Sequence, residues 1–378
     1  MHIKVSLLRD LISQKRFKGV IYLSGYYGRE NLGDDIFLYV LFKGLSKIYP
    51  NSKIITYVED KNKLPREINE LLLTNSNILV FNFSHNRFIH LIQSVKAYLS
   101  EIIVFGGGTY FYDDHPKQKK NLMFIFIFVT IAHCFNKNII SVGIGFDNLR
   151  YTLTKYFSKQ ILKRMDKVIF RDIDSLMTSR KIYYNKNYYL LPDIAYSFSN
   201  KAFVNSKNNT KKIGVNFATH HFNDNIDSAR IIIRELLDLD CEIVIINVQN
   251  NKHSQEWMIQ ERIREEFTQV KQIKYNSNIA IFFQDLGDMN LVIGSKLHLI
   301  ISAHILGIPC VSLAYQEKVK SITNQFISDE YQYSFDHCPT DIVLKAKEIL
   351  LKNNYKYKMD ASSFKKELSL RFREVISS

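Results

Sequence analysis

The stretch LVIGSKLHLIISAHILGIPCVSLA, residues 291–314, contains one complete strand–helix–strand unit. Leu291–Ile293 is a short apolar run that ends at a glycine, and Cys310–Ala314 is a second β-rich run. Between them lies an apolar helical stretch, Leu299–Leu306, which a glycine and a proline separate from the second run. A strand, a helix and a strand in this order predict two parallel strands with the helix packed on their sheet.

The same alternation of short β-rich runs and helical stretches extends along the rest of the chain. It predicts open parallel sheets that helices cover on both faces. The other expected strands are Val20–Ser24, Lys53–Tyr57, Ile78–Phe81, Ile102–Phe105, Ile139–Val142, Lys167–Phe170, Lys212–Phe217, Glu242–Asn247 and Gln272–Tyr275. Helices are expected at Asp35–Ile48, Asn121–Phe135, Tyr151–Arg164, Ser228–Asp238 and Gln255–Phe267.

A polar segment at residues 201–210 divides the pattern into two series. A chain of 378 residues is also too long for one ordinary hydrophobic core. We therefore expect an α/β protein with two Rossmann-like, doubly wound domains, residues 1–200 and 201–350, that face each other across a cleft. Residues 351–378 are expected to form a helical tail that packs back on the first domain.

The composition is that of a globular protein with a basic surplus. Hydrophobic residues make up 46% of the chain and charged residues 23%, which excludes long disorder and coiled coil. Lys and Arg total 51 against 37 acidic residues, a net charge of +14. This surplus suggests an anionic partner, such as a phosphorylated substrate or an anionic membrane surface. Nucleic acid is the least expected partner, because no basic reading helix or aromatic and basic surface stands out.

The cysteines and the apolar runs predict a cytoplasmic protein. The four cysteines are far apart and form no C-x-x-C pair, so neither a zinc site nor a redox pair is expected. Cys134, Cys241 and Cys310 lie in or beside apolar runs, which is typical of reduced, buried thiols in a reducing compartment. The longest apolar run, Leu122–Ala132, is too short to span a bilayer.

Contact with a membrane is therefore expected only at the surface of the protein. Residues 1–20 carry five basic residues against one acidic residue, and residues 351–378 carry seven against three. Both ends have helical patterns, so we expect them to rest on an anionic membrane at the inner face of the cell membrane.

Glycine-rich loops follow three of the expected strands, where ligands bind in open parallel sheets. They read GYYGRENLGDD (residues 25–35), GGGTYFYDD (106–114) and GIG (143–145). Glycine lets backbone N–H groups approach a ligand, although a plain connection between strand and helix is the commoner role of such a turn. None of the loops is a P-loop or a G-x-G-x-x-G fingerprint.

Asp34 and Asp35 open the helix that follows the first of these loops. At least one of them is expected to cap that helix or to compensate its dipole. Two carboxylates at this position would repel a phosphate, whereas the hydroxyl groups of a sugar would suit Asp34. We therefore expect the acceptor of any transfer reaction, and not a phosphate, at this loop.

Lys296, His298 and Lys318 form the strongest candidate site. Lys296 and His298 lie where a helix begins after a strand, and Lys318 lies in the next loop at the same sheet edge. The helix dipole lowers the pKa of a histidine at this position, and a bound anion would raise it again, so His298 could act as an acid near neutral pH. A lone histidine is more often structural, but the two lysines favour a functional role for this one.

The ordered set of these loops resembles the polysaccharide pyruvyl transferase family. The resemblance extends from Gly25 to Phe326. It rests on GYYGRENLGDD, VFGGGTYFYDD, VGIG, VIFRDIDS, LLPDIAYSF and GSKLHLIISAHILGIPCVSLAYQEKV, in this order. Membership implies two Rossmann-like domains arranged as in GT-B glycosyltransferases. It also implies transfer of the pyruvyl group of phosphoenolpyruvate to sugar hydroxyls, which forms a pyruvate ketal on a capsule, exopolysaccharide or cell-wall precursor.

The resemblance also implies roles for individual residues. His298 matches the histidine of the family's R-L-H motif, the proposed general acid, and Lys318 matches a donor-binding lysine. Either Arg150 or Arg171 is expected to be the first-domain arginine that contacts the donor. Residues of the two longer glycine-rich loops are expected to bind the acceptor: Gly28, Asn31, Asp34, Gly107, Gly108 and Thr109.

The chain departs from the family pattern at two positions. Lys296 replaces the arginine of R-L-H, which keeps the charge but loses the bidentate fork that grips a carboxylate or phosphate. Phe146 replaces the proline that usually follows G-I-G. The first departure bears on how the donor is held, and the second is expected only to reshape a turn.

In the expected mechanism, His298 protonates the methylene carbon of phosphoenolpyruvate while a sugar hydroxyl attacks the adjacent carbon. The lysines and one arginine hold the donor, and Asp34 accepts a proton from the acceptor or binds the sugar. No metal or cofactor is expected, and the acceptor could be lipid-linked. Two alternatives remain open, a GT-B-like glycosyltransferase that uses a nucleotide sugar and a non-catalytic partner in polysaccharide assembly.

Overall fold

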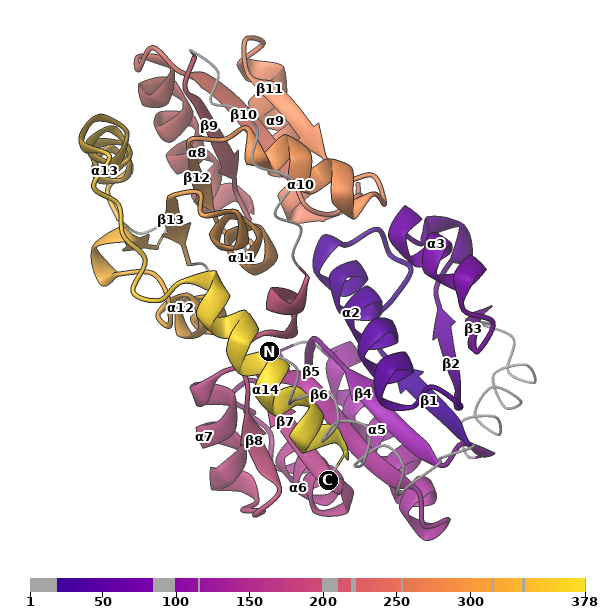
Figure 1. Ribbon diagram of the computed structural model, residues 1–378. Coiled ribbons are helices and arrows are strands. Elements are labelled where there is room, and N and C mark those ends of the chain that lie inside the picture. Colours follow the sequence, from indigo (N-terminus) through magenta and orange to yellow (C-terminus); the bar gives the residue numbers. More distant parts are fainter. Residues whose placement is uncertain are drawn as a thin grey trace.

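The computed structural model describes residues 19–83, 99–114, 116–198, 210–218, 222–252, 254–314, 316–334 and 337–377. Two open parallel sheets lie one above the other, and helices cover both faces of each sheet (Figure 1). The fold is therefore α/β with two Rossmann-like units, as the sequence predicts. The amino-terminal segment and its expected membrane contact lie outside the described residues.

The first sheet has the strand order β3-β2-β1-β4-β6-β7-β8 among the described residues, and β5 pairs with β6. Its strands are β1 (Val20–Ser24), β2 (Lys53–Val58), β3 (Ile78–Asn82), β4 (Ile102–Gly106), β5 (Thr109–Phe111), β6 (Asn138–Phe146), β7 (Lys167–Phe170) and β8 (Tyr188–Leu190). Its helices are α2 (Leu32–Ile48), α3 (Arg66–Thr74), α5 (Pro116–Cys134), α6 (Thr152–Arg164) and α7 (Ile173–Ile182).

The second sheet repeats this topology with the order β11-β10-β9-β12-β13-β14. Its strands are β9 (Lys212–Asn216), β10 (Glu242–Asn247), β11 (Lys271–Lys274), β12 (Leu291–Gly294), β13 (Cys310–Leu313) and β14 (Gln332–Tyr333). Its helices are α8 (Phe222–Leu237), α9 (Gln255–Glu266), α10 (Ile279–Gly287), α11 (Leu297–Leu306), α12 (Glu317–Thr323) and α13 (Pro339–Lys352).

The central strands are apolar along their whole length because helices cover both of their faces. Every residue of β4 and of β12 is buried, and every residue of β6 after its first. The register of β9 and β12 is parallel and continuous, from the pair of Leu291 with Ile213 to the pair of Gly294 with Asn216. All the strands of one sheet therefore end at the same edge, where their loops gather.

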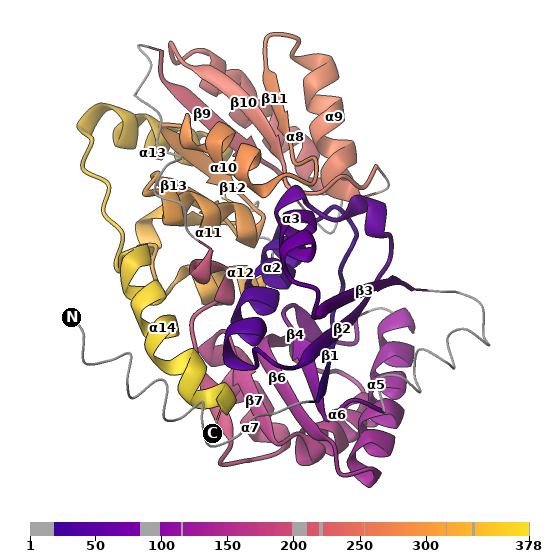
Figure 2. The same ribbon diagram turned by 45° about the vertical axis from the view of Figure 1, so that its right-hand side comes forward.

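The two units contact each other directly through backbone groups and caps. Leu32 N–H donates to the carbonyl of Val248 at 2.9 Å, next to a β-bridge between Asn31 and Gln249. The carboxylate of Glu67 in the first unit accepts from two backbone N–H groups in the first turn of α10, at 3.1 and 2.6 Å. A carboxylate at a helix N-terminus is favourable. These bonds hold α2 and α3 against the second unit (Figure 2).

The carboxyl-terminal helix, α14 (Ala361–Ser377), crosses from the second unit back along the first (Figure 1). Lys167 donates to the carbonyl of Val375 at 2.9 Å, and the Tyr49 hydroxyl donates to the carbonyl of Ile376 at 3.3 Å. The buried ring of His304 stacks on Phe326 and lies 2.8 Å from the Tyr196 hydroxyl, next to this helix. Burial lowers the pKa of His304 to about 4, which fits a structural histidine.

Some local predictions are wrong. Strand β6 does not end at Val142 but continues to Phe146, because Gly143 adopts a positive φ of 68° inside the strand and the register with β7 shifts there. The residues 143–145 are therefore part of a strand and not a loop. The cap of helix α2 is Asn31, whose side chain accepts from two backbone N–H groups, whereas Asp34 and Asp35 lie in the first turn, the position expected for dipole compensation. Cys134 is exposed and free.

None of the helices among the described residues is both long enough and apolar enough to cross a membrane. The four cysteines are all free thiols.

Candidate functional site

His298 lies in the first turn of α11 and points across to the first unit. Its ring packs edge-on against Phe37 of α2, with 4.9 Å between ring centroids. It also lies directly over Gly33, where an added Cβ would overlap the imidazole. Its Nε2 atom is 3.9 Å from Oδ2 of Asp193. The histidine of the second unit is therefore enclosed by residues of the first.

The surroundings of His298 keep its imidazole neutral. Burial first of all, and then the positive charges of Arg171, Lys296 and Lys318, lower its pKa to about 3. Its Nε2 atom is buried and has no hydrogen-bond partner among the residues that the structure describes. A neutral ring with one such nitrogen can accept or donate a proton once a ligand changes the local charge.

Arg171 follows strand β7 and brings the first unit's charge to this histidine. Its side chain is only 4% exposed, and its Nη1 lies 3.7 Å from Oδ2 of Asp193. Its Nη2 donates to the Thr109 hydroxyl at 3.2 Å. Arg150, by contrast, has a side chain that is 72% exposed and pairs with Asp114. Of the two arginines that the sequence left open, Arg171 is the one beside His298.

Asp193 is a site residue that the sequence analysis missed. It precedes the short 3₁₀ turn η2 (Ile194–Ser197), and its side chain accepts from the N–H of Ala195 at 3.0 Å. Its carboxylate is fully buried and lies within 4 Å of both Arg171 and His298. Burial raises the pKa of Asp193, and the charge of Arg171 opposes this rise. The signal was present in LLPDIAYSF, where an aspartate follows a strand and a proline.

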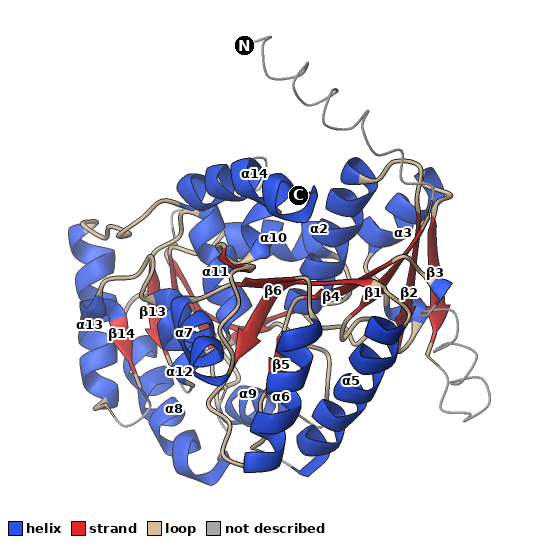
Figure 3. Ribbon diagram, turned by 90° about the horizontal axis from the view of Figure 1, so that it is seen from below, coloured by secondary structure: helices blue, strands red, loops and turns tan. Residues whose placement is uncertain are grey.

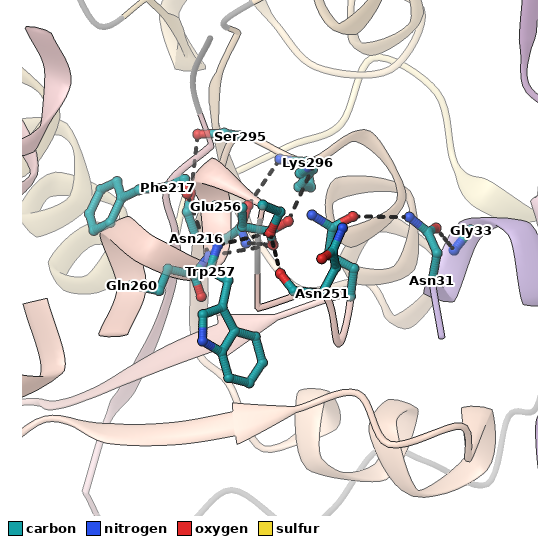
Figure 4. A network of polar contacts seen from close by, with 12 residues as sticks. Asn31, Gly33, Asn216, Phe217, Asn251, Glu256, Trp257, Gln260, Ser295 and Lys296 are labelled. Carbon is teal, nitrogen blue, oxygen red and sulfur yellow. Dashed lines mark hydrogen bonds and ion pairs between the residues drawn. The ribbon is translucent and has the colours of Figure 1, made fainter. Parts of the chain in front are cut away.

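Lys296 rests on a buried polar network (Figure 4). Its Nζ lies 3.4 Å from Oε2 of Glu256 on α9, whose side chain is buried. The other oxygen of Glu256 accepts from Nδ2 of Asn216 at 2.8 Å, and Oδ1 of Asn216 accepts from the backbone N–H of Lys296 at 3.1 Å. This lysine is thus held by a carboxylate and an amide at the edge of the second sheet.

Glu256→Ala is expected to destabilise the protein. The substitution removes the carboxylate partner of Lys296 and leaves Nδ2 of Asn216 without that acceptor in a buried position. We expect the free energy of unfolding to fall by about 2 kcal/mol. Urea unfolding of Glu265→Ala, an exposed residue of the same helix, is the matched control and should change by less than about 0.5 kcal/mol. Equal midpoints for both variants would contradict a structural role for the network.

Lys318 and Asp147 complete the charged cluster. Burial lowers the pKa of Lys318, and the carboxylate of Asp147 is the largest opposing influence. Burial raises the pKa of Asp147, and the charges of Lys318 and Arg171 oppose this rise. Asp147 was also missed in the sequence, although it is the first acidic residue after the G-I-G segment.

The two aspartates of the first glycine-rich loop have different surroundings. Burial raises the pKa of Asp34 to about 7, against the opposing charges of Arg29, Arg171 and Lys296. Asp35 is buried and accepts from the Tyr275 hydroxyl of the second unit at 2.7 Å. Asp34 is therefore the one that shares the electrostatic environment of the cluster, and it can change its protonation state near neutral pH.

The other residues expected to bind the acceptor are arranged unevenly around this cluster. Thr109 contacts Arg171 directly, and Asn31 both caps α2 and donates to Gln249 of the second unit at 3.3 Å. Gly28 and Gly107 have positive φ angles of 74° and 64°. At Gly28 an added Cβ would meet the backbone of the β2–α3 connection, and at Gly107 it would meet the ring of Phe37. Packing therefore requires glycine at both positions. At Gly108 the nearest side chain lies 3.9 Å from the position of an added Cβ, so this glycine has open space beside it.

The charges of the cluster suit a small anion beside a proton-transfer group. Three cationic side chains, Arg171, Lys296 and Lys318, act together on His298. Oriented charges of this kind can hold an anionic substrate and stabilise negative charge on a leaving group. Within the described ranges, no group of three or more His, Cys, Asp or Glu side chains could hold a metal ion.

Solved structures of similar architecture come from nucleotide-sugar enzymes. HepE from Anabaena, in complex with UDP and glucose, has a TM-score of 0.61 at 10% identity, covering 93% of this chain and 98% of that chain. The UDP-GlcNAc 2-epimerase of Neisseria meningitidis, bound to UDP-GlcNAc, has a TM-score of 0.57 at 10% identity, with 94% and 98% covered. That of Methanocaldococcus jannaschii has a TM-score of 0.58 at 13% identity, with 93% and 98% covered. These likenesses show the GT-B-like fold.

The sequence itself gives a more specific match. Among curated proteins, none matches the chain. The model of the family described as polysaccharide pyruvyl transferase matches residues 31–317, which include Asp34, Arg171, Asp193, Lys296 and His298. Because this match extends over most of the sequence, the chain belongs to the polysaccharide pyruvyl transferase family.

Proposed function

We propose that this protein transfers the pyruvyl group of phosphoenolpyruvate to two hydroxyls of a sugar, as a cytoplasmic step in the synthesis of a capsular or extracellular polysaccharide. The observation that carries the proposal is the enclosed His298, which has Asp193 at 3.9 Å and the charges of Arg171, Lys296 and Lys318 around it. The reaction needs an acid near an anionic donor, and this arrangement offers one.

His298 would protonate the methylene carbon of the donor only after the donor has bound. Without a ligand its pKa is about 3, so the ring carries no proton to give at neutral pH. The negative charge of phosphoenolpyruvate would offset the three cations and raise that pKa. The ring would then take up a proton on binding and pass it to carbon, while the sugar hydroxyl attacks the adjacent carbon.

Asp34 is the proposed base for the attacking hydroxyl. With a pKa of about 7, its carboxylate is poised to accept a proton in this pH range. The carbon–oxygen bond to phosphate then breaks, and inorganic phosphate leaves. The second hydroxyl adds to the same carbon and closes the ketal, and its proton goes to solvent or to the departing phosphate.

Arg171, Lys296 and Lys318 are proposed to hold the phosphate and carboxylate of the donor. Arg171 supplies a planar fork that can bind either group bidentately, and its side chain is almost fully buried. Lys296 replaces the fork of the family's arginine with a single ammonium, which Glu256 fixes in place. This pairing supports a positioning role for Glu256 toward the donor site.

Phosphate release from phosphoenolpyruvate tests the proposal. The full-length protein is incubated with phosphoenolpyruvate and a panel of galactosides, mannosides and N-acetylhexosaminides, and the products are identified by mass spectrometry. With one sugar of the panel, we expect phosphate to be released from phosphoenolpyruvate in a stoichiometric amount. We expect that sugar to gain the mass of pyruvic acid less water.

Thermal shift with phosphoenolpyruvate and with UDP separates the alternatives. Stabilisation by UDP alone, without phosphate release, would favour a nucleotide-sugar glycosyltransferase, in line with the ligands of HepE and the epimerases of similar fold. Stabilisation by neither compound, with no turnover of any acceptor, would favour a non-catalytic partner in polysaccharide assembly.

A further inference from the structure

Helices α5 and α6 form a joint outer face of the first unit, on the opposite side of the sheet from α2 (Figure 3). They run side by side, since Phe126 of α5 stacks on Phe157 of α6 with 5.2 Å between ring centroids. The guanidinium of Arg164 lies over the same Phe126 ring at 5.9 Å. We refer to the exposed residues of these two helices as the α5–α6 face.

The α5–α6 face is apolar where a surface helix is ordinarily polar. On α5, Met123, Ile127 and Ile131 are exposed at intervals of four residues, which places them along one outward stripe. Phe124 beside them is 62% exposed, and Leu153 of α6 is 61% exposed. Exposed apolar groups that gather in this way mark a surface that binds a partner.

The same two helices are strongly basic. Together α5 and α6 contain seven Lys and Arg residues and no acidic residue. Lys120, Lys155 and Lys159 are exposed beside the apolar side chains. The face is thus both apolar and cationic.

We propose that the α5–α6 face docks on an anionic lipid bilayer. Its apolar side chains would enter the boundary between headgroups and acyl chains, and its lysines would contact the lipid phosphates. A second copy of the chain would bring two cationic faces together, which is unfavourable. Nucleic acid would satisfy the lysines but would leave the aliphatic stripe in water. An anionic membrane satisfies both properties of the face.

The position of the face relates this docking to the candidate site. A cavity of about 200 Å³ lies where α5 meets the loop after β1, and Gly25, Tyr26 and Phe124 line it. The same loop leads to Asn31 and Asp34. Docking through α5 and α6 would therefore hold this loop near the bilayer, within reach of a sugar carried on a lipid. This last step rests on the proposed function, whereas the docking itself does not.

Vesicle flotation tests the proposal without any turnover. The full-length protein is mixed with vesicles of phosphatidylcholine alone or of equal parts phosphatidylcholine and phosphatidylglycerol. We expect flotation only with phosphatidylglycerol and a steep loss of binding as salt rises. Lys155→Gln combined with Lys159→Gln should weaken partitioning about 25-fold, at about fivefold for each lysine removed. Ile127→Ser combined with Ile131→Ser should weaken it as well.

The matched control is Lys252→Gln combined with Lys347→Gln, which removes two exposed lysines of the second unit. This control should partition within about twofold of the unmodified protein, and circular dichroism should show that all variants are folded. The proposal is overturned if the α5–α6 variants float like the unmodified protein, or if flotation does not depend on phosphatidylglycerol. Because the readout is binding, its failure is distinguishable from a failure of pyruvyl transfer.

Discussion

Replacing His298 with alanine should reduce pyruvyl transfer by about three orders of magnitude. The side chain belongs to the second unit and packs against the first, with Gly33 and Phe37 on one side and Asp193 at 3.9 Å. Removing it deletes the proposed general acid but leaves the three cations that would hold phosphoenolpyruvate. We therefore expect the loss in kcat, with the KM for phosphoenolpyruvate changed little.

His337→Ala is the matched control for this substitution. His337 is exposed, and its ring contacts its neighbours Ser334 and Tyr333, away from the cluster around His298. The control should keep wild-type turnover, and thermal unfolding should show both variants folded. Turnover of His298→Ala within a few-fold of wild type would exclude His298 as the acid.

The pH dependence of donor binding gives a second measure of the same residue. The pKa of His298 is about 3 in the protein without donor, and the donor's negative charge raises it. A group whose pKa rises on binding takes up a proton between its two pKa values, so the affinity for the donor should fall as pH rises through the higher one. Calorimetry in buffers of different ionisation enthalpy should detect this uptake at pH 6, and His298→Gln should abolish it.

The architecture was predictable because each element carries a local pattern. Strands β1, β7 and β10 begin and end at the predicted residues, since an apolar run bounded by polar residues is information that the chain holds locally. The exception at β6 is instructive. A glycine after a strand usually indicates a loop, but Gly143 is used for a positive φ inside the strand, and only its pairing with neighbouring strands shows this.

The candidate site was predictable only in part, because its geometry depends on pairings between distant residues. Arg150 and Arg171 both follow strands of the first sheet, and nothing local distinguishes them. The fold does so by burying Arg171 against Asp193 and leaving Arg150 at the surface. Glu256 was missed for the same reason, since on its own helix it looks like any surface glutamate and becomes a site residue only beneath Lys296.

Gly33→Ala should reduce transfer at least about 100-fold by displacing His298. Gly33 has no positive φ and lies in the first turn of α2, where alanine is the better helix former by about 0.5–1 kcal/mol. The added Cβ would nevertheless overlap the imidazole. The backbone of α2 cannot retreat, because the bond from Leu32 N–H to the Val248 carbonyl holds the start of this helix on the second unit. The ring must therefore move.

Gly44→Ala separates this effect from helix stability. It is the same substitution in the same helix, and its Cβ meets only a partly exposed ring, that of Phe372, at 3.1 Å. Turnover of this control should stay near wild type. The double variant Gly33→Ala with His298→Ala should be no slower than His298→Ala alone, because a methyl group that acts through the imidazole has no effect once that ring is absent. Additive losses, or wild-type turnover of Gly33→Ala, would mean that the two units do not keep this contact during the reaction.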